Sequence, residues 1–393
     1  MTQLLLMQKN KISFNKPFIA GKELFNIVQA VIKYKKLFEV MNSESIECTI
    51  VGPSGDMQYL IGFNPGGCER FQALFILADG RHFYVSNVLY YEDMRNALGD
   101  DTKFYLWKDN EGWFDCIKQA FSDYKLDNKK IAVSNSVRAV DLVDMQNLFS
   151  ANFINGNDML ENYRAVKTWD NIESMREAAY LADKVMEDLT QYIKPGITEK
   201  DIQDKIIKLF SDKGADGISF TPIVASGPNN SRPHYVDNSR VITGKDIIVL
   251  DFGCKVNGYC SDTSRTFFVG GITEKEKKIY DIVKEAYQVA ADFAKEGVKA
   301  CEVDKKARDI IEAAGFGENF LNRTGHGIGY DVHEAPYING NNSQILEKGM
   351  AFSIEPGIYF AGEVGMRIED IVIINEEGKG ETINHFTKDY IIL

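Results

Sequence analysis

The chain lacks the features that most directly mark a nucleic-acid-binding or a membrane-spanning protein. Its 393 residues carry 57 acidic against 45 basic side chains, a net charge of −12, and no basic block beyond short pairs such as Lys129-Lys130. An acidic surface matches nucleic acid and anionic membranes poorly. No segment approaches the roughly 20 apolar residues that a membrane helix needs. We therefore expect neither nucleic acid nor a membrane among its partners.

Cysteine is also scarce. The six cysteines are scattered over the chain, which indicates free thiols in a reducing compartment: Cys48, Cys68, Cys116, Cys254, Cys260 and Cys301. Cys254 and Cys260 flank a tight turn and form the one pair that local spacing brings near each other, but bridges are rare in the cytosol. The apolar stretch Leu4–Met7 has no basic region before it and is too short for a signal peptide. We expect a cytoplasmic protein.

The length and pattern of the chain predict two domains of mixed α and β structure. A polar segment rich in asparagine and glycine, residues 152–162, is the predicted linker between a domain over 1–160 and a domain over 161–393. Apolar periodicity predicts helices over Glu23–Met41, Thr168–Ile193 and Thr198–Lys213, and strands over Cys48–Val51, Ala73–Leu77, His82–Val85 and Lys129–Ser134.

The second half contains an internal repeat. Residues 194–214 align with residues 295–315 at an offset of 101, with lysine, glycine, lysine and glycine identical at four of the 21 positions. Helical patterning alone could produce half of this match, but the same order of elements follows each copy: a helix stop, a turn, a helix and then strands. The pattern predicts two units of helix plus antiparallel sheet that share one core, with a site at their junction.

In the first unit, Asn257-Gly258 predicts a tight hairpin turn that pairs Val256 with Tyr259. In that register Asp251 lies opposite Ser264, and Asp262 points to the same side as Asp251. Both strands are rich in β-prone residues. Two carboxylates that face inward repel each other and lose hydration, and a bound cation would resolve both problems.

The second unit shows the same arrangement of carboxylates within strands. Glu355 ends the apolar strand Met350–Ile354, and Glu369 interrupts the apolar segment Met366–Ile374. His326 stands between glycines in Gly325-His326-Gly327, where the backbone can approach closely. A single strand aspartate is usually an edge residue and a single histidine is usually a loop residue. Their joint placement in repeat-related hairpins favours a metal site instead.

Four carboxylates and one imidazole are too few donors for two separate octahedral ions. They suit two divalent ions that share bridging carboxylates, and four negative ligands balance two such ions. Oxygen-rich donors favour Mn²⁺ or Mg²⁺, and the imidazole admits Co²⁺, Fe²⁺ or Zn²⁺. A pair of ions about 3.5–4 Å apart can activate water and clamp a tetrahedral intermediate.

Five ordered motifs carry a family resemblance: Leu250-Asp251-Phe252-Gly253, Ser261–Thr266, Gly325–Gly329, Ile354–Gly357 and Arg367–Asp370. From about Arg164 to the C-terminus the chain resembles the catalytic domain of the pita-bread metallopeptidases, and most closely the Xaa-Pro aminopeptidases and Xaa-Pro dipeptidases (prolidases). Residues 30–160 resemble the N-terminal domain of the creatinase/prolidase branch. The resemblance implies an α+β fold, with a creatinase/prolidase-like α/β domain followed by a pita-bread catalytic domain.

The resemblance also implies residue roles. Asp251 would bind one metal ion, His326 and Glu355 the other, and Asp262 and Glu369 would bridge the two. Manganese is the expected metal, with cobalt, iron and zinc as alternatives. The expected catalytic residues are His234, His333 and Glu355, the last as a proton shuttle to the leaving amine. The expected substrate-binding residues are His234, His333, Arg367 and Asn322, and Ser264 is expected to donate a hydrogen bond to the metal site.

The predicted activity is hydrolysis of the bond between an N-terminal residue and a following proline, by a homodimer. The sequence departs from the proline-specific pattern at Asn322, where such members commonly carry histidine, so relaxed specificity is one alternative. A creatinase-type C–N hydrolase and a non-catalytic binding module are others, but relatives of both kinds lack the full ligand set that this chain keeps.

Overall fold

The computed structural model describes residues 34–393. Of the predicted helix Glu23–Met41, the described part is helical and continues over residues 34–43, while the rest lies outside the described residues, as does Leu4–Met7. The described chain divides into two compact units. The first comprises residues 34–51, 70–91 and 101–159, and the second comprises residues 52–69, 92–100 and 160–393.

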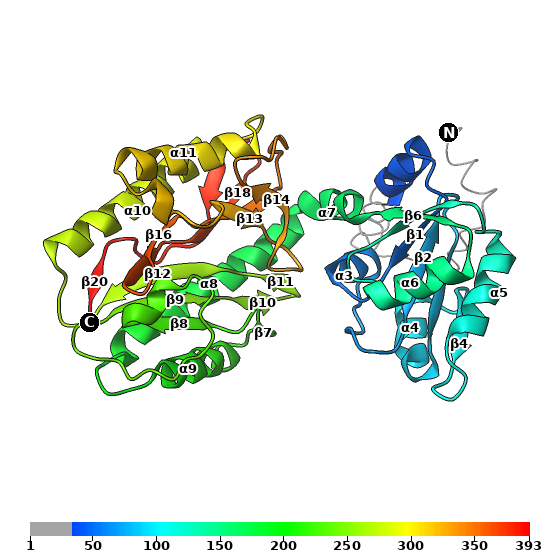
Figure 1. Cartoon of the computed structure of the whole chain (residues 1–393), viewed down its shortest axis with the longest axis horizontal. Coiled ribbons are helices and arrows are strands. Elements are labelled where there is room, and N and C mark those ends of the chain that lie inside the picture. Colours follow the sequence, from blue (N-terminus) through cyan, green and yellow to red (C-terminus); the bar gives the residue numbers. More distant parts are fainter. Residues whose placement is uncertain (1–33) are drawn as a thin grey trace, which may run out of the picture. The chain divides into compact units, whose positions relative to one another are not determined.

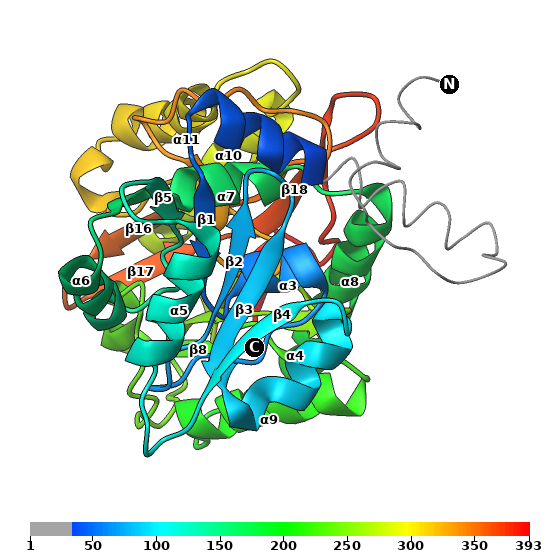
Figure 2. The same cartoon turned by 90° about the vertical axis from the view of Figure 1, so that its right-hand side faces the viewer.

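The first unit is built on a six-stranded sheet with strand order β4-β3-β2-β1-β5-β6. Its strands are β1 (Cys48–Val51), β2 (Ala73–Leu77), β3 (His82–Asn87), β4 (Lys103–Trp107), β5 (Lys130–Val133) and β6 (Asn152–Asn155). Strands β1–β2 and β2–β3 pair antiparallel, and the other pairs are parallel. Figure 2 shows β2, β3 and β4 side by side. The unit also contains helices α5 (Phe114–Tyr124) and α6 (Ala139–Leu148). All four strands predicted from the sequence are confirmed.

Residues 152–162, the predicted linker, do not form a loop. Their first part is strand β6, and their second part begins helix α7 (Asn157–Ala165). Parallel pairing with β5 satisfies the backbone of the strand, and the Gly156 N–H donates to the Val133 carbonyl at 2.9 Å. Backbone pairing thus outweighs the polar composition that suggested a linker. The boundary between residues 160 and 161 itself stays a prediction.

The second unit contains two larger antiparallel sheets. One has the order β20-β12-β9-β8 and the other β14-β13-β15-β18-β19. Their strands are β8 (Ile223–Ser226), β9 (Ile247–Phe252), β12 (Thr263–Phe268), β13 (Gly325–Gly327), β14 (Glu334–Ile338), β15 (Ala351–Ile354), β18 (Asp370–Ile374), β19 (Gly380–Thr382) and β20 (Ile391–Ile392), the last parallel to β12. Smaller sheets consist of β7 (Gly217–Ile218), β10 (Cys254–Val256) and β11 (Tyr259–Cys260), and of β16 (Gly357–Phe360) and β17 (Val364–Arg367).

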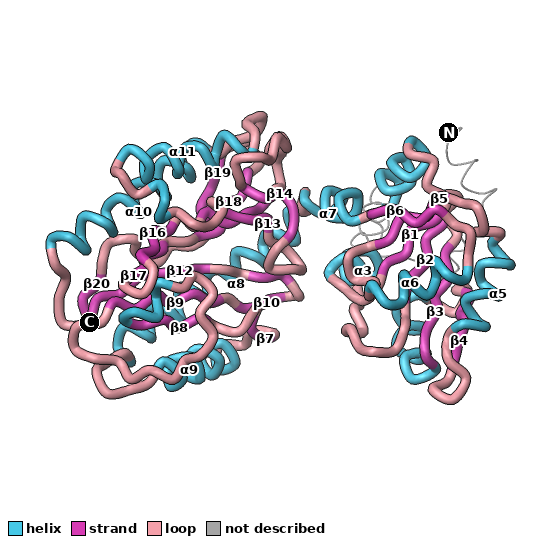
Figure 3. Tube along the Cα trace, in the orientation of Figure 1, coloured by secondary structure: helices cyan, strands magenta, loops and turns pink. Residues whose placement is uncertain are grey.

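The helices of the second unit confirm the internal repeat. α8 (Trp169–Tyr192) and α9 (Glu199–Asp212) precede the first sheet, and α10 (Glu274–Phe293) and α11 (Ala300–Ala313) precede the second. Both ends of α9 and α11 differ by the predicted 101 residues. Figures 1 and 3 show the strands between α9 on one side and α10 and α11 on the other. Helix α3 (Gly55–Ile61) and all but the first residue of α4 (Tyr91–Leu98) also belong to this unit. Short 3₁₀ turns of the described chain span Val88–Tyr90, Gly227–Ser231 and Gly317–Asn319.

Alternation along β9 determines which face each side chain meets. Ile248, Leu250 and Phe252 belong to one apolar core with residues of α8 and α9. Because successive side chains of a strand point to opposite faces, Asp251 points away from that core. In the second half, Phe352 and Ile354, on one face of β15, likewise belong to an apolar core with residues of α10 and α11.

The register of the first hairpin is as predicted. Val256 pairs with Tyr259 and Asp251 pairs with Ser264, across a turn in which Asn257 and Gly258 have φ of 50° and 79°. The ladder is interrupted between β11 and β12, where Asp262 lies. A Cβ on Gly253 would approach the Ser261 carbonyl oxygen to 1.8 Å, so only glycine permits this close crossing.

Glu369 interrupts the apolar segment Met366–Ile374, as predicted. The segment divides into β17 and β18, with Ile368 and Glu369 between them. β17 pairs with β16, whereas β18 pairs with β15 and β19, so the chain changes sheets at Glu369. In each half, therefore, one acidic residue lies where one strand ends and the next strand begins.

The six cysteines are all described and all free, as predicted. Within residues 34–393, no helix combines the length and the apolar character that crossing a bilayer requires.

Candidate metal centre

Five side chains predicted as metal ligands come from both halves of the second unit. Asp251 lies in β9 and His326 in β13, and Glu355 directly follows β15. Asp262 and Glu369 occupy the two strand interruptions. Four of the five are 2–8% exposed, and Glu355 is partly buried. The repeat thus contributes carboxylates from each half to one interior position.

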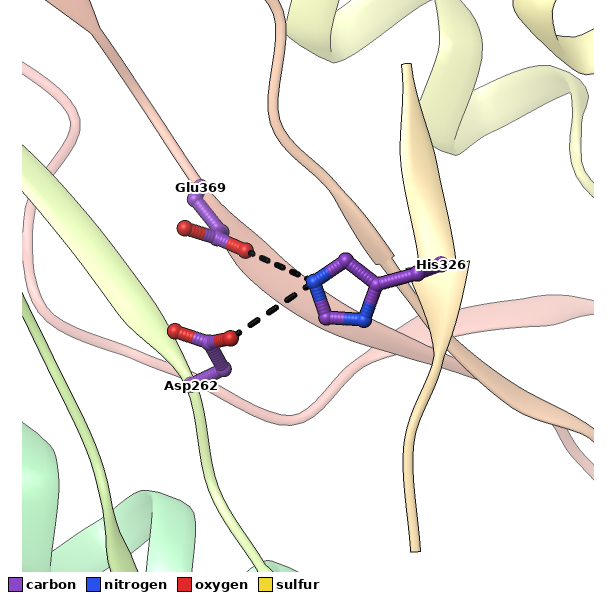
Figure 4. Close-up of side chains that lie close together, drawn as sticks. All are labelled: Asp262, His326 and Glu369. Atoms are coloured by element: carbon purple, nitrogen blue, oxygen red, sulfur yellow. Dashed lines mark ion pairs between the residues drawn. The ribbon is translucent and has the colours of Figure 1, made fainter. Parts of the chain in front are cut away.

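The imidazole of His326 faces three carboxylates. Its Nε2 lies 3.5 Å from Glu355 Oε1, 3.7 Å from Asp262 Oδ2 and 3.9 Å from Glu369 Oε1. Figure 4 shows the Asp262 and Glu369 oxygens directed at the same ring nitrogen. Ligand atoms of Asp262, His326 and Glu369 all lie within 4.8 Å of one another. The ring's other nitrogen, Nδ1, lies 3.1 Å from the Gly327 carbonyl oxygen, which leaves Nε2 free to bind a cation once Nδ1 carries the proton.

Hydrogen bonds fix two of the carboxylates. Ser264 Oγ donates to Glu369 Oε2 at 2.6 Å, and Arg367 Nη2 donates to Asp251 Oδ2 at 2.5 Å. Arg367 Nε in turn donates to Ser264 Oγ at 2.8 Å. Each bond occupies one oxygen of a carboxylate and leaves the other oxygen available for a cation.

Burial and mutual repulsion perturb the titration of the cluster. Burial, with the charges of Glu369, Asp251 and Glu355, raises the pKa of Asp262 well above its usual range. Burial and neighbouring carboxylates likewise raise the pKa of Glu369, and burial raises that of Glu355 to about 7. Burial and the neighbouring His333 lower the pKa of His326. A cluster of carboxylates that resist ionisation beside a neutral imidazole needs a positive charge to become stable in its ionised form.

The donor set fits divalent metal ions. Among the described residues, Asp251 Oδ1 and Asp262 Oδ1 are buried carboxylate oxygens without a hydrogen-bond partner. A buried, unpaired carboxylate oxygen is costly, and coordination of a cation removes that cost. Four carboxylates and one imidazole supply oxygen and nitrogen donors of the kind that manganese, iron, cobalt and zinc accept.

The remaining predicted residues occupy different positions. The His333 ring meets the His326 ring edge-on, with 4.2 Å between centroids, and burial lowers its pKa. His234 is exposed on the loop between β8 and β9. Its neighbour Pro233 accepts a hydrogen bond from Arg367 Nη1 at 3.4 Å, which ties that loop to the carboxylate cluster.

Arg367 is buried rather than directed into open space. Its guanidinium is bound by Asp251, Ser264, Tyr359 and Pro233, and the residue is 2% exposed. These protein acceptors, not a substrate, account for its donors, so the geometry favours a supporting role over the predicted substrate contact.

Asn322 is adjacent to the cluster. Its amide nitrogen donates to the carbonyl oxygens of Arg323 at 2.9 Å and Glu355 at 3.1 Å, which fixes the orientation of the amide. Its Oδ1 is buried and has no partner. An unpaired acceptor therefore lies beside the metal ligands.

Sequence reasoning did not identify two buried ion-pair groups that support the site. Arg265, 1% exposed, donates to Asp370 Oδ1 at 2.8 Å and to the Glu369 carbonyl oxygen at 2.8 Å. Glu334, beside His333, is bound by Arg164 and by Lys167, the latter at 2.7 Å. Charged residues inside apolar strands, as Arg265 is, were the available signal, but their partners are 100 or more residues away.

Comparisons with known proteins identify both parts of the chain. Residues 173–376, more than half of the chain, match the model of metallopeptidase family M24, and residues 33–166 match the creatinase/prolidase N-terminal domain.

The chain belongs to metallopeptidase family M24. It is a hydrolase, and the family implies divalent metal ions as cofactors and peptides as substrates. The predicted fold, a creatinase/prolidase-like domain followed by a pita-bread domain, is confirmed.

Named relatives of this M24 metallopeptidase cover nearly the whole chain. A putative dipeptidase of Bacillus subtilis, YkvY, is 33% identical over 85% of this chain and 92% of its own length. An Xaa-Pro dipeptidase of Lactobacillus helveticus is 33% identical over 86% of this chain and 92% of its own. The crystal structure of a prolidase from Thermococcus sibiricus superposes with a TM-score of 0.87 at 34% identity, over 91% of this chain and 97% of that one.

Proposed function

We propose that this M24 metallopeptidase hydrolyses the peptide bond between an N-terminal residue and a following proline. The observation that carries the proposal is the convergence of His326 Nε2 with the carboxylates of Asp262, Glu355 and Glu369 within 3.9 Å in a buried position. The names of the Lactobacillus and Thermococcus relatives support proline as the second residue.

In the proposed centre, Asp251, Asp262, His326, Glu355 and Glu369 would hold two divalent ions, with Asp262 and Glu369 as the carboxylates that both ions would share. Manganese is the proposed metal, because carboxylate oxygens dominate the donor set. When bound, the ions would polarise the scissile carbonyl and lower the pKa of water. Arg367 acts by holding Asp251, and Ser264 by holding Glu369, so that both carboxylates keep one oxygen directed at the ions.

The other roles belong to residues at the edge of the cluster. Glu355 accepts a proton from the attacking water and passes it to the leaving amine. His234 donates a hydrogen bond to the carbonyl oxygen as negative charge develops on it. His333 holds the substrate beside the scissile bond, against the ring of His326.

The preference for proline follows from the missing N–H. Proline lacks a backbone donor and its ring fixes φ, so a pocket for it needs no acceptor at that position. An ordinary residue would bury an unpaired N–H, at a cost of about 1–3 kcal/mol. The unpaired Oδ1 of Asn322 is a candidate acceptor for that N–H. We therefore propose a preference for proline with measurable turnover of other substrates.

An aminopeptidase of the same fold with relaxed specificity is the second candidate, and Asn322 is the observation in its favour. The creatinase-type hydrolase and the non-catalytic module are disfavoured, since the chain keeps all five ligand residues. Relative rates on Ala-Pro, Ala-Ala and Ala-Pro-Ala distinguish these candidates. Proline-specific activity predicts that Ala-Pro is cleaved faster than Ala-Ala, and equal rates would leave only the general aminopeptidase.

We also propose a domain boundary between residues 160 and 161, a homodimer and a cytoplasmic location. The family resemblance supports the first two, and the six free thiols support the third. Light scattering at micromolar concentration tests the dimer, and a monomeric mass would refute it.

A further inference from the structure

The loop that carries His234 is anchored by one buried carboxylate, that of Glu199. The loop runs from Ser226, at the end of β8, to the start of β9. Glu199 is the first residue of α9 and is 0% exposed. Its side chain leaves the helix and enters the loop instead of pointing to solvent.

All the hydrogen bonds that the Glu199 carboxylate accepts come from this loop. Its Oε1 accepts from the Ser226 N–H at 2.7 Å, from Ser226 Oγ at 2.7 Å and from Asn229 Nδ2 at 3.1 Å. Its Oε2 accepts from the Tyr235 hydroxyl at 2.8 Å and from the Arg240 N–H at 3.3 Å. One carboxylate thus binds the loop before His234, at Ser226 and Asn229, and after it, at Tyr235 and Arg240.

Helix capping does not require Glu199. The N-terminus of α9 is capped by Thr198 and Asp201, which form a capping box on the surface. Within residues 34–393, no lysine, arginine or histidine lies in ion-pair distance of the Glu199 carboxylate. The hydrogen-bond donors that hold this buried carboxylate are neutral and serve the loop and not the helix, while the Arg240 guanidinium, bonded to Asp246, interacts with it only through its charge.

The anchor lies next to the histidine. Tyr235, 3% exposed and bonded to Glu199, follows His234 directly, and Pro233 on the other side is bonded to Arg367. The exposed His234 side chain is therefore held between two buried attachments. One leads to Glu199 and the other, through Arg367, leads to Asp251 of the carboxylate cluster.

We propose that Glu199 is a positioning residue for His234: it aims the histidine at the substrate carbonyl by holding the loop on both sides of it. The inference rests on the proposed function, in which His234 donates a hydrogen bond to that oxygen. The hydrogen bond from a correctly aimed His234 stabilises the transition state, where the charge on the oxygen is greatest, and not the bound ground state.

The test is a double-mutant cycle of Glu199→Gln and His234→Ala on the metal-loaded enzyme, with Ala-Pro as substrate. Glutamine has the shape of glutamate, but its amide N–H₂ must face loop donors in either orientation. We expect Glu199→Gln to lower kcat about tenfold with KM within about twofold and metal content unchanged. In the His234→Ala background, the same change should lower kcat less than about twofold.

Asp201→Asn is the matched control, because it alters an acid in the same helical turn whose side-chain hydrogen bonds go to Thr198 and not to the loop. It should retain the wild-type kcat. If Glu199→Gln does not fold, Tyr235→Phe removes one bond of the same anchor. It should lower kcat about threefold, and the loss should vanish in the His234→Ala background.

Three outcomes would overturn the inference. One is a wild-type kcat for Glu199→Gln. The second is an equal loss of kcat with and without His234. The third is full activity of His234→Ala, which would also refute the role of His234 in the proposed function, whereas the first two leave that role intact.

Discussion

Ser264 and Glu369 bond to each other across the junction of the two repeat halves, through backbone and side chain together. Their backbones form an isolated antiparallel bridge, with N···O distances of 3.3 and 3.1 Å, and Ser264 Oγ donates to Glu369 Oε2 at 2.6 Å. The sheets of the two halves meet here, so the position of one predicted bridging carboxylate depends on the half that does not contain it.

Ser264→Ala tests that dependence. The backbone bridge remains, but Glu369 loses its 2.6 Å donor and can rotate. We expect the variant to fold, and its metal affinity or kcat/KM to fall by about 10- to 100-fold, as for other residues that orient metal ligands. Equilibrium dialysis with Mn²⁺ and Ala-Pro hydrolysis measure the two quantities. Wild-type values for both would contradict the role assigned to the serine.

Asp262→Asn and Glu369→Gln remove the two proposed bridging carboxylates while keeping side-chain size. Each should lose at least one metal ion per chain and most of its activity, because a neutral amide cannot balance the charge of the ions. Metal content by atomic spectroscopy and kcat on Ala-Pro are the measurements. Asp216→Asn, the same change at an exposed residue beside the hairpin turn, is the control. Two bound ions and full activity in either variant would refute the ligand assignment.

Asn322→His should sharpen the preference for proline. Histidine replaces the unpaired amide oxygen that could accept the N–H of an ordinary second residue. We expect the ratio of kcat/KM for Ala-Pro to that for Ala-Ala to rise about tenfold. Asn341→His, at an exposed position, should leave the ratio unchanged. An unchanged ratio in Asn322→His would remove Asn322 from the account of specificity.

The free energy of unfolding is expected to depend on pH through Asp246, which lies outside the metal centre. Although burial alone would raise its pKa, hydrogen bonds from Arg240 and the Thr243 N–H lower it below 3.8. Its ionised form therefore contributes stability that is fully present above pH 3.8 and is lost as the pH falls through the lowered pKa.

Asp246→Asn should accordingly lower the free energy of unfolding by about 1–3 kcal/mol at pH 6. The difference between the variant and the wild type should shrink as the pH drops below 3.8. Urea unfolding at a series of pH values measures it. A difference that stays constant down to pH 2.5 would show that the charge of Asp246 does not produce the stabilisation.

The sequence predicted the first hairpin and the repeated helices of the second unit because their signals are local. Asn257-Gly258 determined the hairpin and with it the pairing of Asp251 with Ser264, and the offset of 101 residues reproduced both ends of α9 and α11. Apolar strands interrupted by carboxylates identified four acidic residues that the structure brings together from both halves.

The sequence did not predict features that depend on partners distant along the chain. The break at Glu369 arises because β17 and β18 pair with different strands, and nothing in Met366–Ile374 alone records that change. The burial of Arg367 follows from acceptors in β9, β12 and β16, and that of Glu199 from a loop 27 or more residues away. Residues 152–162 form a strand and a helix because β5 supplies the pairing that their composition does not suggest.

Cleavage before proline is proposed to depend on two divalent ions held by the five converging side chains. Titration of chelator-treated protein with Mn²⁺ tests this dependence most directly, with bound metal and Ala-Pro hydrolysis followed on the same samples. Hydrolysis should rise with metal occupancy and saturate at two ions per chain. Absence of hydrolysis at full occupancy, or full hydrolysis by the metal-free protein, would contradict this dependence.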